Sequence, residues 1–171
     1  MDESIHKYCP NIQPSAISLK TDFDFLVGTW NVENKKLVSR LSNCNEWLEF
    51  KAVLEMQKTL LGIGNFETFT AEIDGEPFAG EAVRLFDPTT RLWSIYWADS
   101  NFGKLDTDPV VGSFEGDVGR FYAPGIFDGK VITVLYQWDK SDPERPIWSQ
   151  AFSADSDKTW EWNWYMTLTR R

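Results

Sequence analysis

Apolar and polar residues alternate in short runs from Thr29 to Arg170, and turn residues separate one run from the next. A period of two is typical of strands with one face toward a core and the other toward water. Pairs such as Asp74-Gly75 and Asp128-Gly129 supply the turns. We therefore expect about ten antiparallel strands and almost no helix, with the strands near residues 29–40, 46–60, 64–74, 79–87, 91–99, 110–116, 119–124, 130–138, 147–154 and 159–170.

Two segments precede the strands. Residues 1–20 contain prolines and show no sustained period, so we expect a flexible N-terminal arm there. An apolar group then leads to Gly28, and it consists of Phe23, Phe25, Leu26 and Val27. A short helical plug that ends at Gly28 would explain this order, because glycine accepts backbone conformations that other residues avoid. The rest of the chain, residues 21–171, is expected to be a single β domain.

An open sheet of ten strands would expose long edges, which proteins avoid by closing the sheet or doubling it. The fold class that we predict is all-β, a closed antiparallel up-and-down β-barrel of about ten strands. A jelly-roll or other sandwich is the alternative, because the pattern does not determine which strands pair.

Two expected hairpins bring large residues opposite small ones. If Asp87–Thr90 is a four-residue loop, Arg84 lies opposite Trp93 and Gly80 lies opposite Trp97. If Asp155–Lys158 is also a four-residue loop, three small residues lie opposite three tryptophans. The pairs are Ser153 with Trp160, Ala151 with Trp162, and Ser149 with Trp164. The other face of this second hairpin carries polar residues, Gln150, Glu161 and Asn163. We therefore expect the three tryptophans to point into the barrel.

Arg84 would lie on the inward face in this register. A buried guanidinium needs a partner, so Arg84 either pairs with an internal carboxylate or meets an acidic ligand. The small residues opposite each indole leave either a tightly filled core or free space. For the hollow case we predict a small apolar or aromatic ligand, with or without a carboxylate, and the expected ligand-binding residues are Arg84, Trp93, Trp97, Tyr136, Trp160, Trp162 and Trp164.

The net charge of −9, from 26 acidic and 17 basic residues, argues against nucleic acid and anionic membranes as partners. The first residues lack the pattern of a secretory signal, and no apolar run is long enough for a membrane span. We expect a cytoplasmic protein in which Cys9 and Cys44 are reduced thiols.

Few residues carry obvious catalytic chemistry. The only histidine, His6, lies in the arm, and no cysteine cluster or phosphate-binding glycine motif is present, so no metal and no cofactor are expected. The catalytic candidate is Tyr136, acting with Arg84 and with Glu49 or Glu81 in a cofactor-independent lyase or isomerase. A third alternative is a homodimer with a filled barrel, joined through outward aromatics, for which the candidates are Tyr96, Tyr165 and Trp148.

Gly28-Thr29-Trp30 near the start and Thr169-Arg170-Arg171 at the end resemble the calycin group, which includes lipocalins and fatty-acid-binding proteins. The resemblance implies a barrel in which Arg170 covers Trp30 at one end. Residues 23–170 also resemble the DUF1579 family of uncharacterised bacterial proteins, through DFLVGTW, VRLFDPTTRLWSIYWADS, DPVVGSF and WSQAFSADSDKTWEWNWYMTLTR. This second resemblance implies a fold and leaves the function open.

Overall fold

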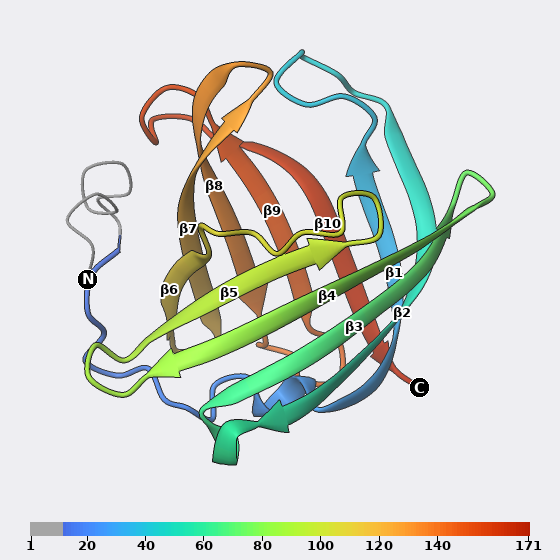
Figure 1. Ribbon diagram of the computed structural model, residues 1–171. Coiled ribbons are helices and arrows are strands. Elements are labelled where there is room, and N and C mark those ends of the chain that lie inside the picture. Colours follow the sequence, from blue (N-terminus) through green and yellow to red (C-terminus); the bar gives the residue numbers. More distant parts are fainter. Residues whose placement is uncertain (1–11) are drawn as a thin grey trace.

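The computed structural model describes residues 12–171, so His6 and Cys9 lie outside the described residues. Ten antiparallel strands each pair with the next in the chain, and the last returns to pair with the first, which closes a barrel (Figure 1). The strands are β1 (Gly28–Leu37), β2 (Trp47–Thr59), β3 (Gly64–Ile73), β4 (Glu76–Asp87), β5 (Leu92–Asp99), β6 (Val110–Glu115), β7 (Val118–Phe127), β8 (Lys130–Asp139), β9 (Ile147–Ser153) and β10 (Glu161–Arg170). The predicted fold class is confirmed.

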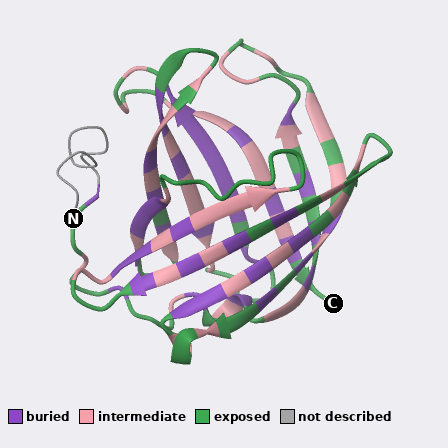
Figure 2. Cartoon of the chain, in the orientation of Figure 1, coloured by how far each residue is buried: buried purple, intermediate pink, exposed green. Residues whose placement is uncertain are grey.

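Helical structure in the described residues is limited to two 3₁₀ turns, η1 (Asp24–Leu26) and η2 (Leu60–Gly62), and no helix there could cross a bilayer. Buried and exposed residues alternate along the strands (Figure 2). In β1, for example, Trp30, Val32 and Asn34 are buried, and the residues between them are exposed. The period of two in the sequence therefore corresponds to the inner and outer faces of the barrel wall.

The turn η1 fills one end of the barrel. Phe23 and Leu26 are 1% and 0% exposed, and the Phe23 ring lies 5.0 Å from that of Trp93. Gly28 follows with φ of +115°, a value that side chains disfavour, and lets the chain turn from the plug into β1. Arg170 covers the junction, because its guanidinium lies 4.0 Å from the Trp30 ring and donates to the carbonyls of Phe25 and Val27.

Residues 12–20 lie against the barrel, in the region where the sequence predicts a flexible arm. Ile12 is 1% exposed and packs with Leu92 and Val111. The Ser18 hydroxyl accepts a hydrogen bond from the backbone N–H of Phe114, and its carbonyl accepts one from Nε of Arg91. This segment therefore binds the outside of β5 and β6 before the chain enters the plug.

The hairpin between β4 and β5 differs from its expected register by two residues. Phe86 pairs with Trp93, and Asp87 pairs with Leu92. The Asp87 carboxylate accepts hydrogen bonds from the N–H of Thr89 and the hydroxyl of Thr90, and Arg91 adopts φ of +58°. The loop therefore includes Arg91, so the predicted pairing of Arg84 with Trp93 was wrong. A shift of two keeps every side chain on its predicted face.

The hairpin between β9 and β10 contains a β-bulge. Ala151 pairs with Trp162 as expected, but Gln150, rather than Ser149, pairs with Trp164. An extra residue in one strand exchanges the two faces beyond it. Asn163 is fully buried and bonds to Gln150, so the prediction that these two amides face water was wrong.

Candidate functional site

The barrel interior is packed near the plug and hollow near the opposite end. A cavity of about 340 Å³ begins above the Arg84 side chain and extends to residues at the far ends of β1 and β5. Because β1 and β5 both run away from the plug, this far end is the mouth of the barrel (Figure 1). The structure therefore contains both a filled core and a cavity, the two alternatives that the sequence left open.

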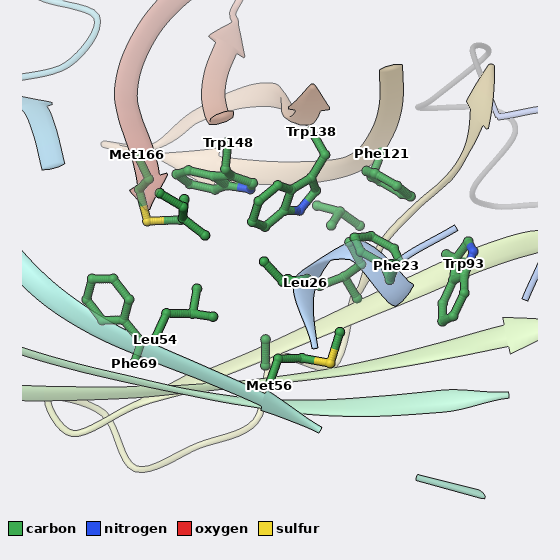
Figure 3. Packing of buried hydrophobic residues seen from close by; sticks show 14 of the residues in the cluster. Phe23, Leu26, Leu54, Met56, Phe69, Trp93, Phe121, Trp138, Trp148 and Met166 are labelled. Carbon is green, nitrogen blue, oxygen red and sulfur yellow. The ribbon is translucent and has the colours of Figure 1, made fainter. Parts of the chain in front are cut away.

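Aromatic rings form a large part of the cavity wall. Trp148 makes edge-to-face contacts with Trp164 and Tyr136, with ring centroids 5.4 Å and 5.0 Å apart. Phe69 and Trp97 face them from β3 and β5. Figure 3 shows the two sides, with Trp138 and Trp148 pointing toward Phe69 and the adjacent Leu54. Such rings offer flat apolar surfaces to a bound molecule.

Arg84 lies at the packed end of the cavity and forms an internal ion pair. Its Nη2 donates to Glu67 Oε2 at 2.5 Å and its Nη1 donates to Asn65 Oδ1 at 3.0 Å. The guanidinium also lies 4.9 Å from the Phe23 ring. Arg84 thus has an internal carboxylate partner, which was one of the two alternatives, and a ligand would have to compete with Glu67 for it.

Tyr136 and Gln150 add polar groups to the middle of the wall. Burial raises the pKa of Tyr136, so the phenol stays protonated at neutral pH. Among the described residues no hydrogen-bond partner is found for its hydroxyl, whereas Gln150 donates to Asn163 Oδ1 at 2.8 Å. The cavity therefore offers one neutral hydroxyl that is free to bind a guest.

Two cationic side chains, Lys36 and Arg40, line the mouth. The Lys36 ammonium lies 4.0 Å from the centroid of the Trp164 ring. Burial lowers the pKa of Lys36 to about 8, and the positive charge of Arg40 contributes in the same direction. Asp99, Asn101 and Phe102 complete the mouth from the opposite side.

Four of the seven predicted ligand-binding residues line the cavity, namely Arg84, Trp97, Tyr136 and Trp164. Trp93 lies in the packed half, where it contacts the plug and donates to the carbonyl of Leu19. Trp160 packs on Tyr122 and Trp162 stacks on Tyr165, both outside the cavity. The predicted inward orientation of Trp160 and Trp162 was wrong, because the bulge reverses the faces between Trp162 and Trp164.

The structure also adds residues that the sequence reasoning missed. Glu67, Trp138 and Trp148 line the cavity, as do Lys36 and Arg40. Trp148 was expected on the outer surface as part of a dimer contact, and that orientation was wrong. Glu49 and Glu81, the carboxylates expected to act with Tyr136, are exposed on the outer surface. The carboxylate beside Arg84 belongs to Glu67.

No family model matches the chain, and no curated protein matches it, so membership of the DUF1579 family is not confirmed. The S-type phycobiliprotein lyase CPES from Guillardia theta is similar in structure, with a TM-score of 0.58 and 11% identity over 91% of this chain and 94% of that chain. The protein EF1p2_mFAP2b, solved bound to DFHBI, has a TM-score of 0.49 and 15% identity over 90% of this chain and 100% of that chain. The likeness to the lyase shows a shared fold, in agreement with the closed antiparallel β-barrel described above.

Proposed function

We propose that the barrel binds a small aromatic or apolar molecule in the cavity between the plug and the mouth. The observation that carries this proposal is the cavity of about 340 Å³ between facing aromatic rings. Small-molecule sites are concave and mostly apolar, with a few placed polar groups. The Tyr136 hydroxyl and the two cations at the mouth are groups of that kind.

The packed half of the barrel favours this function over a barrel that is only a scaffold. Phe23, Phe114 and Phe121 fill the plug end with rings 5.1 to 5.8 Å apart. Protein interiors are normally close-packed throughout, and empty apolar space destabilises a fold. A cavity kept beside such a core is best explained by a guest that fills it.

Native mass spectrometry of the purified protein, followed by titration with aromatic and fatty acids and their neutral analogues, tests the proposal. A retained small mass or saturable quenching of tryptophan fluorescence would support it. Ala82→Leu should weaken binding, because Ala82 lines the cavity. Ala79→Leu, on the exposed face of the same strand, is the matched control. Absence of binding in every titration of folded protein would refute the proposal.

A cofactor-independent lyase or isomerase is the second candidate. It is favoured by one observation, that the Tyr136 hydroxyl lines the same cavity as the Glu67–Arg84 pair. A protonated phenol can donate a proton or a hydrogen bond to a substrate. If the protein turns over a bound aromatic molecule, Tyr136→Phe should abolish turnover and keep binding. An unchanged rate would remove Tyr136 from the mechanism.

A further inference from the structure

Lys36 and Arg40 line the mouth without a carboxylate partner within the described part of the chain. The ion pairs found in residues 12–171 are Lys58–Asp24, Arg84–Glu67 and Lys140–Asp22. The Lys36 ammonium faces the Trp164 ring, and the Arg40 guanidinium lies 5.1 Å from the Phe127 ring. Two half-buried cations thus share the mouth with aromatic neighbours.

Two acidic side chains near the mouth, Asp99 and Glu161, already have hydrogen-bond partners, and Asp128 attracts Arg40 without forming an ion pair with it. Asp99 accepts hydrogen bonds from Trp97 Nε1 and from the backbone N–H of Asn101. Both carboxylate oxygens of Glu161 accept a hydrogen bond from the backbone N–H of Leu41, at 2.8 and 2.9 Å. These carboxylates attract the two cations from a distance without forming an ion pair with either of them. The mouth therefore lacks an anion in direct contact with its cations.

The Trp164 indole is held in place below Lys36. Its Nε1 donates to Oδ1 of Asn34, a residue that is 3% exposed, at 3.0 Å. One face of the ring is thereby fixed toward the ammonium, and the residue itself lines the cavity. A planar guest that packs against the aromatic wall would bring its outer edge close to Lys36.

We propose that the natural ligand is an aromatic carboxylic acid whose single carboxylate binds between Lys36 and Arg40, while its ring occupies the cavity. This inference rests on the proposed ligand-binding function and specifies its ligand class. A carboxylate there would relieve the repulsion between the two cations and form charge-assisted hydrogen bonds. Arg84 does not serve this purpose, because Glu67 already neutralises it. The protein's net charge of −9 and the nearby Asp99 and Glu161 disfavour a multiply charged anion.

The test compares 2-naphthoate with its neutral amide, 2-naphthamide, by isothermal titration calorimetry at about pH 7. The two probes have nearly the same shape, so a difference in affinity reports the carboxylate. Hydrogen bonds to a charged group typically contribute enough to change affinity by about tenfold or more. We expect the wild-type protein to bind the acid about tenfold more tightly than the amide, and Lys36→Gln or Arg40→Gln to remove most of this preference.

Lys35→Gln is the matched control, because Lys35 is the adjacent residue of β1, is exposed, and lies over Trp47 on the outer face. It changes the net charge equally and should leave both affinities unchanged. If the wild-type protein binds the acid and the amide equally well, the ligand is not recognised through a carboxylate. The proposal that the barrel binds a small aromatic molecule would still hold. An equal loss of preference in Lys35→Gln would likewise overturn the proposed ligand class. Failure of the wild-type protein to bind either probe would overturn this inference, and the titrations with fatty acids and their analogues would then decide the wider function separately.

Discussion

The indole of Trp97 occupies the space that a side chain at Gly80 would need. A Cβ atom placed on Gly80 would lie 2.2 Å from Cη2 and 2.3 Å from Cζ2 of Trp97. The two residues are not direct partners, since Gly80 pairs with Asp99 and Ala82 with Trp97. The Trp97 ring therefore lies against β4 at Gly80, two residues along the strand from its direct partner Ala82.

Gly80→Ala should force the Trp97 ring to move and should destabilise the fold by about 1–3 kcal/mol, the usual range for overpacking. Urea denaturation measures the loss. Trp97→Leu removes the obstructing ring, so the alanine should be much less destabilising in the double variant. If the two changes are additive, Trp97 does not occupy the position that the structure gives it.

The effect of replacing Glu67 on the stability of the protein should depend on whether Arg84 is present, and the reverse should also hold. Glu67→Leu or Arg84→Met alone leaves an uncompensated buried charge, and each should destabilise the protein by about 3–5 kcal/mol. The double variant replaces the pair by apolar side chains of similar size and should recover most of the loss. Thermal unfolding of the four proteins measures the coupling, and a double variant no better than the worse single one would contradict this account.

Arg170 should contribute much more than its neighbour Arg171 to stability. Arg170→Ala removes the contact with Trp30 and the hydrogen bonds to Phe25 and Val27, whereas the exposed side chain of Arg171 makes no such contacts. From the range for hydrogen bonds to charged groups, we expect a loss of about 1.5–3 kcal/mol for Arg170→Ala. Arg171→Ala should stay within about 0.5 kcal/mol of wild type. Similar losses in both variants would argue against the closing role of Arg170.

Affinity for a carboxylate probe should fall as the pH rises through the pKa of Lys36, which is lowered to about 8. Below that pH the ammonium is charged and attracts the anion, and above it the neutral amine does not. Arg40 keeps its charge in this range, and Asp99 is the acidic group that faces Lys36 across the mouth. Calorimetry with 2-naphthoate from about pH 6.5 to 9.5 should show the decline, with 2-naphthamide and Lys36→Gln as flat controls. A flat wild-type profile would exclude Lys36 as the titrating group.

The strands were predictable because inward-facing residues recur at every second position and because characteristic turn residues separate one strand from the next. The two register errors have different causes. At Asp87 the loop is extended by side-chain hydrogen bonds and by the positive φ of Arg91, which the sequence does not reveal. At Asn163 the alternation of tryptophans continues through the bulge, so nothing local marks the exchange of faces.

The cavity was harder to predict than the wall. Glu67 lies between Phe66 and Phe69, and the apolar pattern there does not choose between the two faces of β3. Its pairing opposite Ala82, one step from Arg84 on the same face, would have identified the ion pair once the β3–β4 register was known. Lys36 and Arg40 resemble ordinary surface cations in the sequence, because only the closed barrel brings them over the aromatic wall.

The plug of Phe23 and Leu26 makes the barrel a container with one opening, and not a channel with two. Any guest has to leave by the path along which it entered, so the next molecule cannot push it out from behind. Exchange is then limited by spontaneous departure, at a rate that does not depend on how much competitor is present.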